Sequence, residues 1–328
     1  QDIIVLKNNK GTEDNRVRKL DYSIQLSKLF YERFIQNKEI SLFSPHDCPN
    51  LYESFGTDKF DDLYCSYEAN ESIPRNTVGA QELILDLLKE RAETGRIYIM
   101  NIDHCNSHSS FKDKVEMSNL CQEITLPTTP IQDIHDEQGE IALCILSAVN
   151  VGALNDLSEL ENICDLSVRA LEQIIDYQDY PVRAAEVSTK NRRSLGIGYI
   201  GLAHYLAKNN VKYSDPKAWE LVDRLSEAFQ YHLLRASCNI AMEKGKCEAF
   251  DRTKYAEGLL PIDHYKKEVD EIVPHKQRMA WESLRKDIAK YGLRHSTLSA
   301  QMPSESSSVV GNETNGIEPP RALLSIKK

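Results

Sequence analysis

Short apolar segments alternate with amphipathic segments along this chain, and this alternation is the strongest constraint on its fold. Residues 96–101 and 139–150 are compact apolar runs typical of buried strands. Residues 157–175 and 216–244 carry apolar side chains at helical spacing, and Pro216 suits the first turn of the longer helix. Strands that alternate with helices predict an α/β fold with a barrel-like arrangement.

Weaker signals predict the remaining elements. The expected strands are residues 3–6, 294–300 and 322–327, and residues 7–15 are expected to form a loop. The expected helices are residues 21–37, 78–93 with Thr77 as N-cap and Gly95 after the end, 279–291, and short surface helices within 57–75. Cys164 lies on the apolar stripe of the helix at 157–175, so it is interpreted as a core residue.

Charge and cysteine usage exclude several classes of function. The net charge of −10 provides no general attraction for nucleic acid or an anionic membrane, and no apolar run approaches the roughly 20 residues of a membrane helix. The eight cysteines are scattered without CxxC pairs, which indicates reduced thiols and a cytoplasmic location. No signal peptide is recognised. Both ends of the chain have the character of strands, so we expect one piece of a longer polypeptide.

Residues 117–127 place three chemically capable side chains at alternate positions, Asn119, Cys121 and Glu123. In an extended segment these three would share one face. A lone cysteine is more often a small core residue than a reactive one. The neighbouring amide and carboxylate, together with Cys144 in the next strand-like run, favour a functional interpretation.

Two other motifs have weaker support. His104, Cys105 and His108 resemble half of a zinc site, but no second pair of ligands lies nearby, so a polar loop is favoured over a metal. Gly196, Gly198 and Gly201 spell the dinucleotide fingerprint GxGxxG, but the polar residues before them cannot form the required strand. Close packing of a helix that ends near residue 208 is the favoured interpretation.

A serine-rich run follows the expected strand at residues 294–300. It combines hydroxyl groups with the backbone N–H groups of a helix that begins after Ser304, which is a credible phosphate cradle. An ordinary capped turn explains this run equally well. The thiols of Cys121 and Cys144 suit a nucleophile, a redox pair or a hydrogen-atom donor. Because no histidine stands out as a base, redox or radical chemistry fits best.

Four motifs, in this order, resemble the large (alpha) subunit of class I ribonucleoside-diphosphate reductases of bacterial or phage type. They are Asn119–Ile124 (NLCQEI), Glu140–Cys144 (EIALC), Met302–Ser307 (MPSESS) and Asn315–Arg321 (NGIEPPR). The similarity extends along the whole chain, including Val5–Asn9 and Asp103–Asn106. The resemblance implies that residues 1–328 are part of one catalytic α/β barrel domain of ten strands, with a central finger loop and flanking helices.

The resemblance also implies roles for individual residues. Cys121 would be the transient thiyl radical that abstracts the 3′ hydrogen of the substrate, Glu123 the base on the 3′ hydroxyl, and Asn119 a hydrogen-bonding partner of the ribose. Cys144 would be one of two redox-active thiols. Substrate-binding positions would be Asn119, Leu120, Cys121, Gln122, Glu123, Pro303, Ser304, Glu305, Ser306 and Ser307.

The implied reaction reduces ribonucleoside diphosphates to 2′-deoxyribonucleoside diphosphates for DNA replication. Implied partners are the rest of the large subunit, the metal-containing small (beta) subunit that supplies the radical, and thioredoxin or glutaredoxin as reductant. No cofactor or metal is expected on this chain, nor any nucleic acid or membrane. The ATP and dNTP effector regions, the radical-relay tyrosines, the second redox thiol and the C-terminal cysteines are not recognised, so the chain alone is expected to be inactive. The alternatives are a non-catalytic scaffold fragment and a nicotinamide-dependent enzyme.

Overall fold

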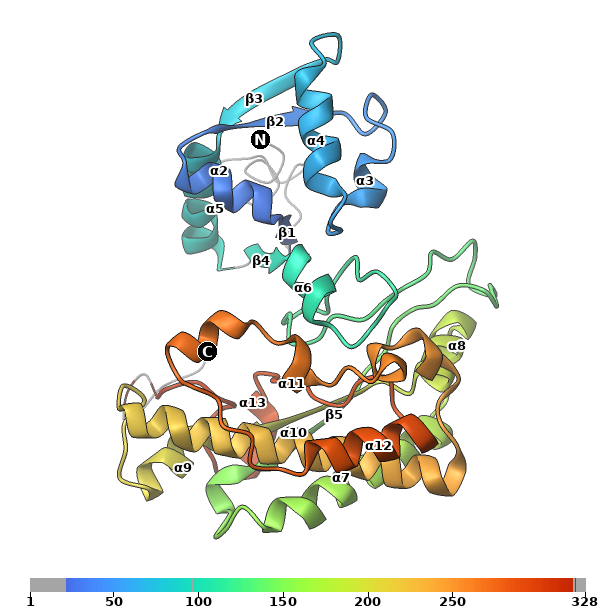
Figure 1. Cartoon of the computed structure of the whole chain (residues 1–328), viewed down its shortest axis with the longest axis vertical. Coiled ribbons are helices and arrows are strands. Elements are labelled where there is room, and N and C mark those ends of the chain that lie inside the picture. The colour runs from blue at the N-terminus through green and yellow to red at the C-terminus, as the bar shows by residue number, and fades with distance from the viewer. Residues whose placement is uncertain (1–21, 96, 321, 323–328) are drawn as a thin grey trace. The chain divides into compact units, whose positions relative to one another are not determined.

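A computed structural model describes residues 22–95, 97–320 and 322 of the chain (Figure 1). The chain divides into two compact units, Gln1–Ser109 and Ser110–Lys328, and each is described here by itself. The strands expected at residues 3–6 and 322–327 and the loop at 7–15 lie outside the described residues, apart from residue 322. None of the helices in the described part of the chain is long and apolar enough to cross a membrane.

The first unit combines short strand pairs with helices. Its elements are β1 (Tyr22–Leu26), α2 (Lys28–Ile35), β2 (Glu39–Phe43), α3 (Leu51–Ser54), α4 (Phe60–Ala69), β3 (Arg75–Gly79), α5 (Ala80–Thr94), β4 (Ile97–Asn101) and α6 (Ile102–His108). Strand β1 pairs with β4 in parallel, and β2 pairs with β3 in antiparallel orientation. Apolar side chains of β1, α2 and α5 form its core, including Leu26, Phe30 and Ile84.

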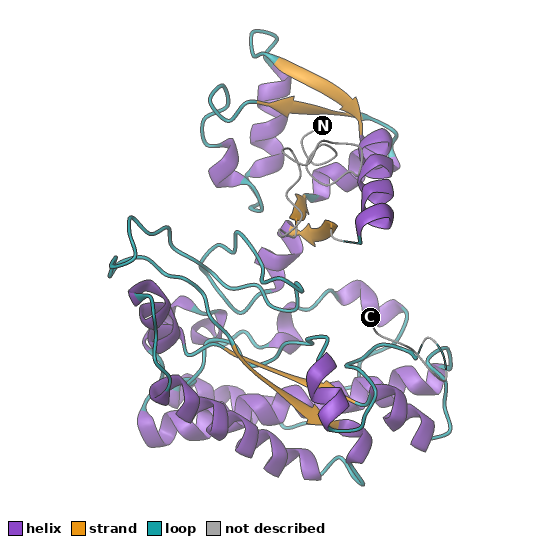
Figure 2. Ribbon diagram, turned by 180° about the vertical axis from the view of Figure 1, so that it is seen from behind, coloured by secondary structure: helices purple, strands orange, loops and turns teal. Residues whose placement is uncertain are grey.

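The second unit is larger and contains every residue of the expected active site. Its elements are β5 (Ile145–Asn150), the 3₁₀ turn η2 (Val151–Ala153), α7 (Glu159–Tyr177), α8 (Arg183–Arg192), β6 (Leu195–Ile200), α9 (Leu202–Lys208), α10 (Pro216–Lys244), η3 (Glu248–Arg252), η4 (Lys254–Glu257), α11 (Pro261–His264), η5 (Lys267–Glu271), α12 (Trp281–Tyr291) and α13 (Glu305–Val310). Figure 2 shows its two strands lying against the helices.

Strand β6 is the buried centre of the second unit. It pairs in parallel with β5, and all six of its residues are buried. Residues 297–300 run alongside it: the Ile197 N–H donates to the Leu298 carbonyl at 2.8 Å, and the Ala300 N–H donates to the Ile197 carbonyl at 3.2 Å. Helices α7 and α10 bury their apolar stripes in the same core. Strand β6 therefore lies between β5 and residues 297–300 and can fix the positions of side chains on both.

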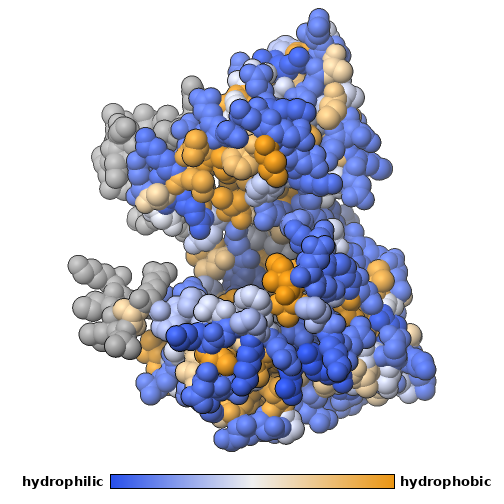
Figure 3. Space-filling model, turned by 60° about the vertical axis from the view of Figure 1, so that its left-hand side comes forward, coloured by the Kyte–Doolittle hydropathy of each residue, from blue (hydrophilic) through white to orange (hydrophobic). Residues whose placement is uncertain are grey.

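The helices with strong local signals are confirmed. Helix α10 spans the expected residues, α7 and α12 lie within two residues of their expected limits, and Cys164 is fully buried. Gly95 ends α5 in the left-handed conformation, and β4 forms where expected. Hydrophilic side chains cover much of the face shown in Figure 3, as the high net charge suggests.

Several sequence-based assignments in the first unit are wrong. The helix expected at residues 21–37 begins as strand β1, because that segment pairs with β4, and α2 begins only after Ser27. The Ser27 hydroxyl accepts the Phe30 N–H and acts as the N-cap. Thr77 is no N-cap, since it pairs with Ser41 in the ladder of β2 and β3, and α5 starts at Ala80. In each case pairing with a distant segment overrides the local helical pattern.

The second unit corrects three further expectations. Residues 195–200 form strand β6 instead of the start of a helix, and residues 294–300 make only an isolated bridge to it. The apolar run at 139–150 becomes a strand only from Ile145 onward, and Leu143 and Leu146 are exposed. The described residues form three separate two-stranded ladders, so they do not close a barrel. The ten-stranded barrel remains a prediction.

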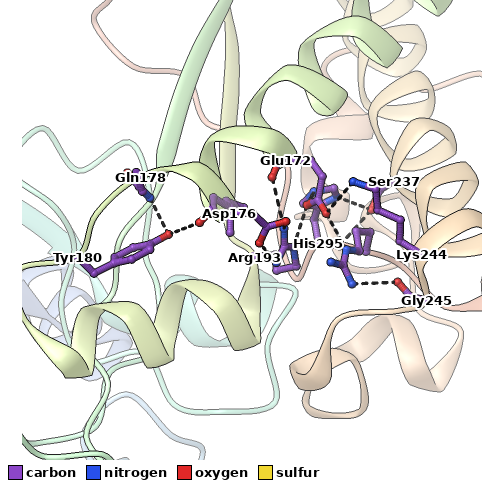
Figure 4. Close-up of polar contacts among 11 residues, drawn as sticks. Glu172, Asp176, Gln178, Tyr180, Arg193, Ser237, Lys244, Gly245 and His295 are labelled. Carbon is purple, nitrogen blue, oxygen red and sulfur yellow. Dashed lines mark hydrogen bonds and ion pairs between the residues drawn. The ribbon is translucent and has the colours of Figure 1, made fainter.

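A buried network of charged side chains joins the elements around β6 (Figure 4). Glu172 of α7 accepts hydrogen bonds from Arg193 at 2.8 Å, from Arg294 at 2.8 Å and from the His295 Nε2–H at 3.0 Å. The other ring nitrogen of His295, Nδ1, accepts a hydrogen bond from the Ser237 hydroxyl of α10 at 2.9 Å. Burial raises the pKa of Glu172, but these hydrogen bonds outweigh it and lower the pKa to about 2. The network ties α7, α10 and residues 294–295 together.

Candidate active site

The segment that carries Cys121 is a tight hairpin. Ser118 and Thr125 form an antiparallel bridge, and the Asn119 N–H donates to the Ile124 carbonyl at 3.3 Å. The Asn119 side-chain oxygen accepts the Ile124 N–H at 3.3 Å. Gln122 has a φ of 60°, the left-handed conformation that allows the chain to reverse. Residues 120–122 therefore form the tip of a projecting loop.

The expectation that Asn119, Cys121 and Glu123 share one face of an extended strand is wrong. The chain reverses within these residues, so alternation does not apply, and the amide of Asn119 braces the turn. Cys121 is exposed at the tip, as is Leu120, instead of being enclosed in a barrel. The physical reason is that the described strands do not close around the hairpin.

Cys144 lies close to the carboxylate of Glu123. Burial raises the pKa of the Cys144 thiol to about 12, and the charge of Glu123 adds to this increase. Cys144 is thus protonated at neutral pH, and both Cys121 and Cys144 are thiols without a disulfide. A cavity of about 550 Å³ is lined on one side by residues of the hairpin and its flanks, within 116–131, and on the other by residues 140–144, the arm that carries Cys144. Asn119 and Cys144 both line it.

Two buried polar atoms at the hairpin lack a hydrogen-bond partner within the described residues. They are Oε2 of Glu123 and Nε2 of Gln122. Buried polar groups are normally satisfied, so unsatisfied ones in a structure without ligands are candidates for contacts with a substrate. Gln122 follows Cys121 directly in the chain, and Glu123 is the next residue.

The glycines of β6 allow its two neighbours to approach closely. A Cβ at Gly196 would lie 2.7 Å from the Cys144 sulfur and 3.2 Å from the Cβ of Ala300. A Cβ at Gly198 would lie 2.4 Å from the Ala300 carbonyl oxygen and 2.9 Å from the sulfur of Met302. Cys144 therefore lies at the start of one neighbour of β6, and the segment that leads to the serine-rich run forms the other neighbour. The glycines serve strand packing instead of the helix packing that was expected.

Gly198→Ala is expected to destabilise the second unit by about 1–3 kcal/mol, because the new methyl group meets a backbone carbonyl that cannot rotate away. Gly196→Ala is the matched variant: its methyl group meets the movable ends of Leu146 and Cys144, so the loss should be smaller. Denaturant unfolding followed by tryptophan fluorescence measures both. An equal loss in the two variants would contradict this explanation.

The serine-rich run begins directly after buried Met302 and continues into α13. Ser304 occupies the N-cap position with a φ of 55°, but its side chain makes no capping hydrogen bond. Pro303, Glu305, Ser306 and Ser307 are exposed at the start of the helix. Ser308 differs from them, because it is buried and donates to the Glu305 carbonyl. An ordinary side-chain-capped turn therefore does not describe this run.

The two weaker motifs acquire simple structural explanations. His104, Cys105 and His108 lie on helix α6 instead of in a polar loop, with the two imidazole rings 5.7 Å apart. Across the ranges that the structure covers, no three His, Cys, Asp or Glu side chains group as metal ligands. The GxGxxG glycines follow helix α8 and lie mostly within β6 itself, so they do not form the strand-to-helix turn of a dinucleotide site.

One group of residues near the site was not recognised from the sequence. Arg192 is buried and binds both Glu140 and Asp113, which lie on either side of the hairpin in the chain. The available signal was a charged pair, Arg192 and Arg193, directly before a run of small and apolar residues. A buried arginine requires buried carboxylates, but the sequence does not say which ones.

Comparison with known proteins identifies the family. A family model described as the ribonucleotide reductase barrel domain matches residues 1–328. The alpha subunit of ribonucleoside-diphosphate reductase from Haemophilus influenzae is 57% identical over 332 residues, that from Buchnera aphidicola subsp. Baizongia pistaciae is 56% identical, and that of Enterobacteria phage T4 is 43% identical over 336 residues. Each alignment covers 100% of this chain and 44% of the relative. The chain therefore belongs to the ribonucleotide reductase barrel-domain family.

Proposed function

We propose that this chain carries catalytic residues of a ribonucleoside-diphosphate reductase, which converts ribonucleoside diphosphates into 2′-deoxyribonucleoside diphosphates. The observation that carries the proposal is the family match over residues 1–328, with relatives more than 50% identical over the whole chain. In the overall reaction the 2′ hydroxyl leaves as water, and two thiols become one disulfide. The chain spans 44% of the length of these relatives, so the activity belongs to a larger assembly.

The hairpin provides the groups that act on the ribose. Cys121, as a transient thiyl radical, takes the hydrogen atom from C3′, and Glu123 accepts the proton of the 3′ hydroxyl. The unsatisfied Oε2 atom of Glu123 supports this role, because a carboxylate oxygen without a partner can accept that proton. Asn119 fixes the turn and lines the cavity, where it contacts the sugar. Leu120 and Gln122 complete the contact surface at the tip.

Cys144 provides one of the two reducing thiols. Its burial and the neighbouring Glu123 charge keep the thiol protonated at neutral pH, so it can deliver a hydrogen at C2′ instead of attacking as a thiolate. The residues Pro303, Ser304, Glu305, Ser306 and Ser307 hold the diphosphate through the exposed start of α13. Anchoring the diphosphate removes much of the freedom of the substrate relative to the two thiols.

Completion of the site requires partners. Exposed Cys121 needs shielding from solvent before it can hold a radical, and the remaining parts of the large subunit provide it. The metal-containing small subunit supplies the oxidising equivalent, and thioredoxin or glutaredoxin reduces the disulfide after each turnover. ATP and deoxynucleoside triphosphates act as effectors through other regions of the subunit.

Glu123→Gln in the complete reductase tests the acid–base role. The amide keeps the size of the side chain but cannot accept the proton, so kcat is expected to fall by about 10²–10⁴-fold with little change in substrate affinity. Product formation by chromatography and equilibrium binding of the diphosphate measure the two effects. Unchanged turnover would exclude the catalytic role and leave the chain as a scaffold of the same enzyme.

A further inference from the structure

The hairpin that carries Cys121 is held at its base by one buried arginine. The guanidinium of Arg192 forms two hydrogen bonds with Glu140, from Nε at 2.9 Å and from Nη2 at 2.7 Å. Its Nη1 atom donates to Asp113 at 2.9 Å. The side chain of Arg192 is only 2% exposed and that of Glu140 only 6%. Paired hydrogen bonds of this kind fix both the distance and the orientation of the two groups.

Arg192 binds one end of the hairpin segment, residues 113–129, directly through Asp113, and the other end indirectly through Glu140. Asp113 precedes Cys121, and Thr129 follows it. Thr129 and Glu140 exchange two backbone hydrogen bonds of 3.1 and 3.0 Å, and the Thr129 hydroxyl donates to the Glu140 carboxylate at 3.0 Å. Glu140 also begins the arm that leads to Cys144. One guanidinium therefore binds the start of the hairpin segment directly and, through Glu140, is connected to the end of that segment and to residues 140–144, the arm that carries the second thiol.

The contacts of Arg192 with Glu140 and Asp113 depend on the shape of the guanidinium as well as on its charge. Burial raises the pKa of Glu140, but the hydrogen bond and charge of Arg192 outweigh that effect and keep the carboxylate ionised. Arg252 reaches Asp113 at 2.9 Å and Glu140 at 3.5 Å from the more exposed side. A second positive charge is thus present, but Arg192 alone makes the paired contact with Glu140. Lysine could keep the charge of Arg192 but not its simultaneous bonds to both carboxylates.

We propose that Arg192 is a positioning residue for the reductase reaction, holding the Cys121 hairpin in register with the Cys144 arm. The expected effect of Arg192 on kcat rests on the proposed function. Its expected effect on the position of the hairpin does not. Arg192 is the last residue of helix α8, shortly before β6, and its carbonyl accepts the Ser296 N–H at 3.0 Å. This hydrogen bond ties the Arg192 backbone to the segment that runs alongside β6, and Cys144 packs against Gly196 of β6 itself.

Arg193 provides a matched control. It is the next residue, is also buried, and also binds two carboxylates, Glu172 and Asp176. Both of these belong to α7, so Arg193 makes none of these contacts with the hairpin segment. Arg193→Lys should destabilise the second unit without changing the hairpin, whereas Arg192→Lys should change both.

The experiment compares Arg192→Lys with Arg193→Lys. In the 328-residue chain, Arg192→Lys should accelerate hydrogen exchange at the Thr129 and Glu140 amides, relative to other protected amides of the unit, while Arg193→Lys should not. In the complete reductase, Arg192→Lys should lower kcat by about 100-fold with little change in KM, since the reacting groups are displaced but the diphosphate site remains. Arg193→Lys should retain wild-type kcat below its unfolding temperature.

Asp113→Asn is a milder variant that tests the proposal if Arg192→Lys does not fold. Asp113→Asn loosens only the first end of the hairpin segment, so it should lower kcat less while Thr129 and Glu140 keep their amide protection. Equal exchange and equal kcat in both arginine variants, or full activity of Asp113→Asn where Arg192→Lys does not fold, would overturn the proposal. Altered exchange together with an unmodified complete enzyme that shows no reductase activity would support the positioning and refute the proposed function.

Discussion

Replacing Cys121 with serine in the complete reductase is expected to abolish formation of deoxyribonucleotides while the ribonucleoside diphosphate still binds. A thiol is the only side chain at the hairpin tip that can accept and return a hydrogen atom, and the neighbouring Leu120 and Gln122 cannot replace it. The substitution changes one atom, so the turn between Asn119 and Ile124 should persist. Product analysis after incubation with the small subunit and reductant measures turnover, and equilibrium dialysis measures binding.

Cys65→Ser is the control for this prediction. Cys65 is likewise exposed but lies on α4 of the first unit, outside the residues assigned to the reaction. Its serine variant should retain full turnover. Sustained product formation by the Cys121 variant would refute the radical mechanism, and a simultaneous loss in the Cys65 variant would point to a general effect of removing surface thiols.

Glu172→Gln is expected to cause the largest loss of stability, about 3–5 kcal/mol for the second unit. The change removes the negative charge that Arg193, Arg294 and His295 share, and the Glu172 side chain is 1% exposed, so water cannot replace it. Urea unfolding followed by tryptophan fluorescence isolates this unit, because the two tryptophans of the chain, Trp219 and Trp281, both lie in it.

The pH dependence of this effect has a definite sign. The pKa of Glu172 lies at about 2 in the folded protein, below its ordinary value of 4.5. The ionised carboxylate therefore contributes its full stabilisation above pH 4.5, and this contribution is lost as the pH falls toward 2. The wild-type chain should lose stability across that interval, and Glu172→Gln should lack this part of the loss.

Glu186→Gln is the control for the buried carboxylate. Glu186 also pairs with two cations, Arg183 and Lys190, but on the exposed side of α8. Exposed ion pairs contribute little, so this variant should stay within about 0.5 kcal/mol of the wild type. A similar loss in the two variants would show that burial of the Glu172 network is not the source of its stabilisation.

Local signals in the sequence were sufficient for the long helices and for the family. Pro216 and Gly245 bound α10, and apolar spacing marks α7, because a helix satisfies its hydrogen bonds with residues three or four positions away. The order of the four motifs pointed to the reductase family without any knowledge of the fold.

Only the tertiary structure decided how the hairpin turns, which strands pair and which carboxylates each buried arginine binds. The reversal at Gln122, the pairing of β1 with β4 and the contact of Arg192 with Glu140 all join segments whose partners lie elsewhere in the chain. Such contacts depend on which surfaces meet after the chain has folded, and no local pattern records that choice. Helices carry their hydrogen-bond partners within themselves, whereas strands, tight turns and buried charges obtain theirs from the rest of the molecule.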